Sequence, residues 1–332
     1  MSPTQHAVDA PSVMAVDGLV IRFALRRGIG AMLRGGASHF NAVDQVSFAV
    51  RPGEVLGLVG ESGSGKTTIG KAMLRLYEPK EGSIRYRHQD ITHLGGKALR
   101  DIRPHLQMVF QDPLSSLNPR HSIRTALATP LLVHDRVHPD QVDGRIDNIL
   151  RQVGLPVAFK HRFPHEMSGG QLQRVAIGRA LILDPSLIVA DEPVSKLDVS
   201  VRAKILNLFK DIQARLGIAL VFITHDLRVA RYLCDRIAVM YFGKLVEVAP
   251  TREIFTRPYH PYTRALLGTI QNVGSGPPLA GEAFNPTTDR QGCRFYSRCP
   301  MRKDSCLHSH PPMESVGNDH RIACYEWRSA AI

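Results

Sequence analysis

The sequence lacks a long apolar run. Of its 332 residues 43% are apolar, yet the longest runs, such as IALVFI and VLGLV, fall far short of the ~20 residues that a membrane-spanning helix needs. The N-terminal stretch MSPTQHAVDAPS also lacks the charged-then-apolar pattern of a secretion signal. We therefore expect a cytoplasmic chain with a globular core and not an integral membrane protein.

Cysteine is scarce and unevenly placed. Of five cysteines, Cys234 lies in an apolar stretch and is predicted to be a core thiol without a role. Disulfides are rare in cytoplasmic proteins, so clustered cysteines there are more often metal ligands. The other four have wider spacings than common zinc sites and differ from ferredoxin patterns. Spacing leaves open a zinc site aided by His308, His310 or His320, an iron–sulfur cluster, or unligated thiols: Cys293, Cys299, Cys306 and Cys324.

A net charge of +12 suits nucleic acid, an acidic lipid surface, an anionic ligand or simply a basic solvated surface, and charge alone does not choose among them. Residues 1–13 are predicted to be disordered. The stretch 21–43 has four arginines and no acidic residue, which fits contact with a membrane surface or a partner, or a solvated loop: Arg22, Arg26, Arg27 and Arg34.

The order of elements predicts the fold class. Residues 45–59 alternate and then become continuously apolar, as buried strands do, and a glycine loop and a helical stretch follow. After Asp198, a plausible N-cap, apolar residues recur at helical spacing until Gly217, and IALVFITH then reads as a buried strand. Strand, helix and strand in this order predict an α/β protein with a mainly parallel sheet.

The stretch GESGSGKTT has P-loop spacing directly after the apolar strand. Its glycines let successive backbone N–H groups point at phosphate oxygens. Lys66 brings positive charge to the β- and γ-phosphates, and Thr67 can ligate Mg²⁺. The predicted ATP-binding residues of this loop are Gly60, Ser62, Gly63, Ser64, Gly65, Lys66, Thr67 and Thr68.

Polar residues follow three further apolar runs. Asp191 and Glu192 end LIVADEP, where Asp191 would hold Mg²⁺ and Glu192 would deprotonate the attacking water. His225, after VFIT, could bind the γ-phosphate or the water, and Gln111, in MVFQDP, could sense the γ-phosphate and Mg²⁺. Taken singly, the histidine and the glutamine could equally be structural or surface residues.

The stretch MSGGQLQRVAIGRAL resembles the signature of ABC-type ATPases, and the other motifs occur in that family's order over about residues 14–250. The resemblance implies a parallel-sheet core, an antiparallel β subdomain and a helical signature subdomain. It also implies a dimer in which one subunit's signature closes over ATP on the other's P-loop. The signature residues are Ser168, Gly169, Gly170 and Gln171.

The resemblance assigns further roles. Gln111 belongs to a loop that senses the γ-phosphate and contacts a membrane subunit. His225 belongs to the segment that the family uses as its switch. Phe23 is expected to stack on adenine, with Phe40 as the alternative. The loop that crosses the dimer interface is Ser195, Lys196, Leu197 and Asp198.

Lys196 departs from the family, because relatives commonly have alanine there. A buried unpaired ammonium is costly, so we expect Lys196 to meet a phosphate, a carboxylate or solvent. The hypothesis is that it alters communication between the two ATP sites without abolishing hydrolysis.

The stretches QDPLSSLNPR and RPYHPYTRALL resemble ATP-binding subunits of bacterial peptide importers of the oligopeptide and dipeptide type. This implies an ATP-binding domain over residues 14–255 and a C-terminal extension over 256–332. It further implies ATP-driven peptide uptake with a second, different ATPase subunit, two permease subunits and an extracytoplasmic solute-binding protein. The chain would lie peripherally on the cytoplasmic face of the inner membrane and bind no nucleic acid.

Other members of the subgroup import nickel, glutathione or opines, and these alternatives stay open. A same-fold exporter or a soluble ABC ATPase acting on ribosomes or DNA is a further alternative. In peptide importers, cysteine-rich extensions are associated with a [4Fe–4S] cluster, which the resemblance assigns to the four tail cysteines, with zinc as the alternative. Such a centre would mainly fold and fix a tail that has little core of its own.

Overall fold

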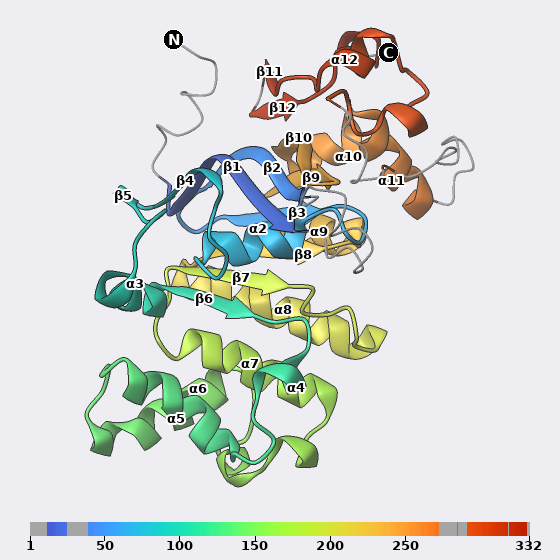
Figure 1. Ribbon diagram of the computed structural model, residues 1–332. Coiled ribbons are helices and arrows are strands. Elements are labelled where there is room, and N and C mark those ends of the chain that lie inside the picture. The colour runs from blue at the N-terminus through green and yellow to red at the C-terminus, as the bar shows by residue number, and fades with distance from the viewer. Residues whose placement is uncertain (1–11, 25–38, 272–283, 285–290, 318, 331–332) are drawn as a thin grey trace, which may run out of the picture. The chain divides into compact units, whose positions relative to one another are not determined.

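The computed structural model describes residues 12–24, 39–271, 284, 291–317 and 319–330 (Figure 1). The predictions for residues 1–11 and for Arg26, Arg27 and Arg34 lie outside this range. The chain divides into two compact units. Unit 1 holds residues 1–50, 55–92 and 224–332, and unit 2 holds residues 51–54 and 93–223.

Unit 1 contains an antiparallel four-stranded sheet of order β2-β1-β4-β5. Its strands are β1 (Met14–Ala24), β2 (His39–Val50), β4 (Glu81–Tyr86) and β5 (Gln89–Asp90). β1 and β2 lie side by side (Figure 1) and bury Leu19, Ile21 and Val43. This is the antiparallel β subdomain that the resemblance implied.

The second sheet of unit 1 leads into the P-loop. β3 (Val55–Val59) is buried throughout and pairs in parallel with β9 (Arg236–Tyr241). β10 (Lys244–Pro250) pairs antiparallel with β9 and, on its other side, with β12 (His320–Ile322), which pairs with β11 (Glu314–Gly317). Residues from the end of the sequence thus extend the sheet that contains β3.

The helices of unit 1 begin with α2 (Lys66–Met73), directly after the P-loop. α9 (Leu227–Leu233) contacts both β3 and α11. The other helices among its described residues are α10 (Thr251–Thr256), α11 (Pro261–Gln271) and α12 (Ser305–His308), with 3-10 turns η6 (Tyr296–Arg298) and η7 (Trp327–Ala330).

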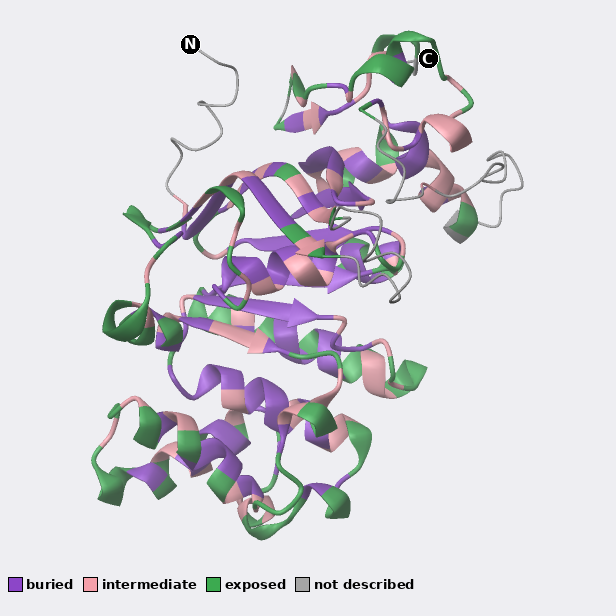
Figure 2. Cartoon of the chain, in the orientation of Figure 1, coloured by how far each residue is buried: buried purple, intermediate pink, exposed green. Residues whose placement is uncertain are grey.

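Unit 2 has three parallel strands: β6 (Leu106–Val109), β7 (Leu187–Asp191) and β8 (Ala219–Thr224). Figure 2 shows β7 buried, in contrast to the largely exposed α3 (Gly96–Ile102). α8 (Val199–Leu216) ends at the left-handed Gly217, as the sequence predicts. Asp198 occupies the N-cap position, as the sequence predicts, although its side chain makes no capping hydrogen bond.

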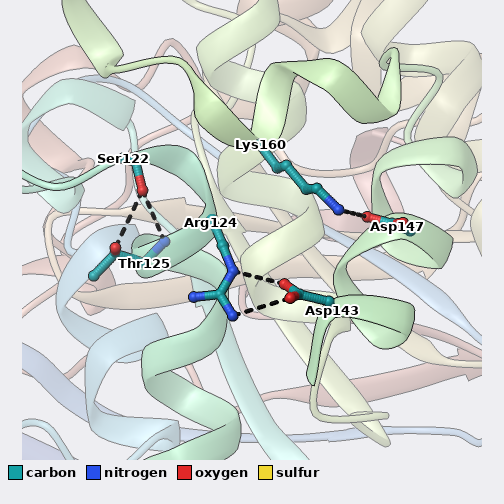
Figure 3. Close-up of polar contacts among 6 residues, drawn as sticks. All are labelled: Ser122, Arg124, Thr125, Asp143, Asp147 and Lys160. Atoms are coloured by element: carbon teal, nitrogen blue, oxygen red, sulfur yellow. Dashed lines mark hydrogen bonds and ion pairs between the residues drawn. The ribbon is translucent and has the colours of Figure 1, made fainter. Parts of the chain in front are cut away.

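The helical part of unit 2 packs α5 (Ile123–Val133) and α6 (Val142–Gln152) against each other and against α7 (Gly169–Leu181). Figure 3 shows the Arg124 guanidinium donating two hydrogen bonds to Asp143, at 2.6 and 3.1 Å. Lys160 pairs with Asp147 at 2.8 Å, and Ser122 caps α5 through the Thr125 amide.

Short helical turns complete unit 2: α4 (Pro113–Ser116), η2 (Arg103–His105), η3 (Pro139–Gln141), η4 (Val157–His161) and η5 (Pro164–Glu166). Across the described ranges of both units, no helix is both long and apolar enough to cross a membrane.

Candidate functional site

The P-loop connects β3 to α2 in a conformation that its glycines require. Gly65 has φ = 100°, and a Cβ there would lie 2.3 Å from the Ala42 carbonyl oxygen. A Cβ on Gly60 would lie 2.2 Å from the Met240 carbonyl oxygen. Both contacts are with backbone that cannot move aside, so neither position accepts a side chain without rearrangement.

Lys66, the first residue of α2, curls back over this loop. Its Nζ donates to the carbonyl oxygens of Gly60 and Glu61, at 2.9 and 2.8 Å, and lies 3.3 Å from Ser64 Oγ. The lysine and Ser64 are buried, whereas Ser62 and Gly63 are exposed and Thr67 and Thr68 are half-buried. A cationic group and a helix N-terminus therefore meet at a loop built of small residues, which is a cradle for phosphate.

Phe23 and its alternative Phe40 belong to one aromatic cluster in unit 1. Their ring centroids are 6.0 Å apart, and the Phe23 ring also meets Tyr77 edge-on at 5.4 Å. Lys71 Nζ lies 5.7 Å from the Tyr77 ring. Phe23 and Phe40 are both half-buried, so each keeps ring surface that a planar base could stack on.

In unit 2, Asp191 is the last residue of β7 and is buried, and Glu192 follows it directly. Glu192 has a left-handed φ of 44°, which is uncommon for a residue with a side chain. Its N–H donates to the Ile223 carbonyl oxygen at 3.0 Å, and Gln111 Nε2 donates to Glu192 Oε2 at 3.2 Å. The structure therefore brings the predicted base and the predicted γ-phosphate sensor into contact.

The loop after Glu192 is hydrogen-bonded to that residue, because Ser195 Oγ donates to the Glu192 carbonyl oxygen at 3.0 Å. Lys196 Nζ lies 3.5 Å from Asp112 Oδ2, and its side chain is 61% exposed. The expectation that this lysine meets a carboxylate or solvent is thus consistent with its surroundings. It links the loop to the residue directly after Gln111.

The signature residues begin α7. Ser168 is its N-cap: its Oγ accepts from the Gln171 N–H at 3.4 Å, and Gln171 Oε1 accepts from the Ser168 N–H at 3.0 Å. This reciprocal capping box fixes where the helix starts. A Cβ on Gly170 would lie 2.5 Å from Val201 Cγ1 of α8, so the glycine permits close packing of the two helices.

His225 follows β8 and is exposed. The next residue, Asp226, caps α9 by accepting from the Arg228 N–H at 2.9 Å. His225 and the P-loop belong to unit 1, whereas Gln111, Asp191, Glu192 and the signature belong to unit 2.

The four tail cysteines line a single pocket together with His260, Phe295 and Met301. Cys306 is buried and the others are half-buried. Burial, with a smaller contribution from the neighbouring thiols, raises the pKa of Cys293 to about 12 and that of Cys324 to about 11. Within the ranges that the structure describes, no three His, Cys, Asp or Glu side chains are arranged to hold a metal ion.

We compared the positions of these four cysteines with what a metal ion or a metal cluster requires. Four thiols converge on one pocket, as a ligand spanning all of them would require, but they do not form a site for a single ion. Zinc needs thiolates at about 2.3 Å from one centre. Within the described residues, the arrangement thus shows a shared pocket of four thiols and supports neither a zinc site nor a cluster.

The contacts between the P-loop and residues after 256 were not predicted from the sequence. Glu61 N–H donates to Tyr262 Oη at 2.8 Å, and Arg298 Nη1 pairs with the Glu61 carboxylate at 3.1 and 3.2 Å. Arg294 Nη2 lies 2.5 Å from the Asp44 carboxylate. The only signal in the sequence was that two arginines flank cysteines, which does not identify their partners.

Comparison with known proteins agrees with this geometry. Residues 43–195 match the family model described as ABC transporter, and residues 246–306 match that of the oligopeptide/dipeptide transporter C-terminal region. The oligopeptide transport ATP-binding protein AppF of Bacillus subtilis (strain 168) is 44% identical, and the match covers 96% of this chain and 98% of AppF. A peptide import ATP-binding protein of Brucella ovis is 43% identical, with 88% and 96% covered.

Solved structures show the same fold. A dimeric post-hydrolysis state of the ATP-binding cassette MJ0796, bound to ADP and Pi, superposes with a TM-score of 0.63 at 28% identity and covers 72% of this chain and 99% of its own. CbiO1 from Clostridium perfringens, part of the transporter complex cbiONQ, gives 0.63 at 26% identity, covering 74% and 92%. The predicted ABC-type P-loop fold is confirmed. The chain therefore belongs to the ABC transporter family, as an ATP-hydrolysing subunit of the group that powers peptide import.

Proposed function

We propose that this chain hydrolyses ATP to drive uptake of peptides or a peptide-like solute through a transporter in the cytoplasmic membrane. The observation that carries the proposal is the P-loop, in which Lys66 Nζ lies against a glycine-dependent loop at the N-terminus of α2. A loop of this kind binds the phosphates of a nucleotide through backbone N–H groups and one lysine.

In this proposal the remaining roles follow the motifs. Thr67, Gln111 and Asp191 would hold Mg²⁺, and the ion would neutralise charge on the β- and γ-phosphates. Glu192 takes the proton of the attacking water, His225 orients the γ-phosphate or that water, and the aromatic cluster of Phe23 stacks on adenine. The hydrogen bond between Gln111 and Glu192 supports the proposal that the γ-phosphate sensor and the general base act at the same place.

We further propose that Ser168 to Gln171 act on ATP bound by a second ATPase subunit, since the start of α7 carries the partial positive charge of a helix N-terminus, which favours an anion. The loop Ser195 to Asp198 would face the same interface. The second subunit would be a different chain, and two permease subunits and an extracytoplasmic solute-binding protein would complete the transporter.

For the tail, we propose that Cys293, Cys299, Cys306 and Cys324 hold a [4Fe–4S] cluster, which would fold and fix the segment without redox catalysis. The proposal starts from the pocket that the four thiols share. After anaerobic purification, brown protein with broad absorption near ~400 nm and about four iron atoms per chain is expected. Colourless protein with stoichiometric zinc, or with no metal, would reject the cluster.

The test of the transport function is purification of the tagged chain from membranes, followed by ATPase and peptide-uptake measurements. Two permease subunits and a second ATPase subunit are expected to co-purify, and Lys66→Ala is expected to lose ATP binding and uptake together. Co-purification with ribosomes or DNA would reject the importer. Uptake of nickel, glutathione or an opine in place of peptides would reject the solute class alone.

A further inference from the structure

We infer that Tyr262 and Arg298 are positioning residues for nucleotide binding, acting from the C-terminal segment (residues 257–330) through Glu61 of the P-loop. The inference rests on the proposed function to the extent that the loop Gly60 to Thr68 must be the ATP site. The inference adds to the proposed function that the ATP affinity of this site depends on two side chains, which lie 201 and 237 positions from Glu61 in the sequence.

Glu61 connects two parts of unit 1 through its own polar groups. Its carbonyl oxygen accepts from Lys66 Nζ at 2.8 Å. Its N–H donates to Tyr262 Oη at 2.8 Å, and its carboxylate pairs with Arg298 Nη1 at 3.1 and 3.2 Å. The residue that meets the predicted phosphate-binding lysine on one side is thus held by the C-terminal segment through both backbone and side chain.

The groups that hold Glu61 are themselves fixed. The Tyr262 side chain is fully buried, and its ring meets Tyr241 at 4.6 Å and Phe295 at 5.5 Å. The Arg298 side chain is only 11% exposed. Side chains that packing already confines lose little further entropy by holding a partner, so these contacts restrain the loop more than surface contacts would.

A second connection reaches the middle of the loop, at Ser64. The Ser64 carbonyl oxygen accepts from the Gly243 N–H at 2.7 Å, and the Gly243 carbonyl oxygen accepts from the Asp44 N–H at 2.9 Å. Arg294 donates to both the Phe242 carbonyl oxygen and the Asp44 carboxylate. The turn from Cys293 to Cys299 therefore supplies one arginine that contacts the loop directly, at Glu61, and one that contacts the loop's neighbours Asp44 and Phe242.

These contacts either dock the C-terminal segment or position the P-loop, and an experiment can distinguish the two roles. If they only dock the C-terminal segment, their loss changes folding stability and leaves nucleotide affinity unchanged. If they position the loop, their loss weakens ATP binding, because the loop then samples conformations in which its N–H groups diverge from the phosphates. The turnover number at saturating ATP would change little, since neither residue belongs to the proposed hydrolytic groups.

The experiment is a double-variant cycle on the full chain: Glu61→Gln, Arg298→Gln and the combination, with ATP affinity measured by calorimetry at matched salt. Each single variant is expected to bind ATP about 3- to 10-fold more weakly. The double variant is expected to be no weaker than either single one, because the two residues act as one unit. Arg298→Lys should recover part of the loss, and Tyr262→Phe should weaken binding through loss of its hydroxyl alone.

The matched control is Arg328→Gln, an exposed arginine of the same segment that contacts only the Trp327 ring among the interactions described for it. Wild-type ATP affinity in Arg298→Gln and Tyr262→Phe, or losses that multiply in the double variant, would overturn the inference. The Lys66→Ala variant distinguishes a failure of the proposed ATP site from a failure of the positioning role. If it too binds ATP normally, the proposed ATP site is wrong; if it fails to bind, only the positioning role is rejected.

Discussion

Glu247 Oε1 lies 2.7 Å from His320 Nε2, although the glutamate is completely buried. The same carboxylate accepts from the backbone N–H groups of Tyr259 and His260, at 2.7 and 3.1 Å. One side chain of β10 therefore binds both the start of the segment that leads into α11 and the strand β12. A buried carboxylate is tolerated only where hydrogen bonds of this kind replace its hydration.

Replacing Glu247 by Gln should destabilise unit 1. The neutral side chain keeps one acceptor but points an N–H₂ group at donors, so about 3–5 kcal/mol of unfolding free energy should be lost. Urea unfolding of the purified chain measures this. Glu78→Gln, at an exposed position, serves as control and should change stability by less than ~0.5 kcal/mol. Equal stabilities for the two variants would show that the buried carboxylate is not needed.

The stability of unit 1 should decline as pH falls, in part because of His260. Burial lowers the pKa of His260 to about 4, and the nearby Glu247 opposes this only partly. Its Nδ1 accepts from the Tyr262 N–H at 3.1 Å, which requires an unprotonated nitrogen. The folded pKa is below the unfolded value of 6.5, so only the unfolded chain takes up the proton below that value. The stability is therefore complete above about pH 6.5 and is lost as the pH falls towards 4.

Between about pH 7 and pH 5 this single group should cost at most about 2 kcal/mol. His260→Asn supplies an acceptor that does not titrate and that can bind the N–H two residues on. The difference in unfolding free energy between wild type and His260→Asn should therefore shrink as the pH falls. A difference that is constant over this range would mean that His260 protonates equally in both states.

Glu192→Gln should bind ATP with wild-type affinity and hydrolyse it ~10²–10⁴-fold more slowly, since an amide cannot take the proton of the attacking water. The amide is close in size to the carboxylate and can still contact Gln111. Single-turnover hydrolysis separates the chemical step from product release. Asp211→Asn, on an exposed position of α8, removes a charge of the same sign and should leave the rate unchanged. Full hydrolysis by the Gln variant would reject Glu192 as the base.

Lys196→Ala should leave folding stability within about 0.5 kcal/mol of wild type, because an exposed ion pair at 3.5 Å contributes little. We expect the ratio of solute transported to ATP hydrolysed to change, since the lysine links the loop after Glu192 to the loop after Gln111. Reconstituted transporter allows both rates to be measured together. Lys204→Ala, an exposed lysine of α8, is the control. Unchanged rate and coupling in Lys196→Ala would leave this lysine without a role.

The parts of the fold that the sequence predicts are those specified by local patterns. β3 and β8 follow from continuous apolar runs, and the end of α8 follows from Gly217, whose φ of 62° suits glycine. The P-loop could be recognised because its glycines and lysine are adjacent in sequence. Asp198 was predicted as the N-cap of α8 on the same reasoning and occupies that position, but residue type alone does not show that its side chain makes no capping hydrogen bond.

The contacts that join the C-terminal segment to the P-loop could not be predicted. Tyr262 is 201 positions from Glu61, and Arg298 is 237 positions from it. No periodicity connects residues so far apart, and one arginine among many gives no indication of its partner. The contact between Gln111 and Glu192, 81 positions apart, was not predicted either, because the sequence and the family resemblance gave these residues separate roles.

The separation of Glu61 from Arg298 also has a consequence for biosynthesis. A ribosome that adds about 5–20 residues per second reaches Arg298 roughly 12–50 s after Glu61. The strand, loop and helix that contain Lys66 are complete early, but the guanidinium that holds Glu61 emerges with the last part of the chain. A growing chain therefore possesses the phosphate-binding loop well before it possesses Arg298, and under the positioning role inferred above tight ATP binding would arise only after Arg298 has been made.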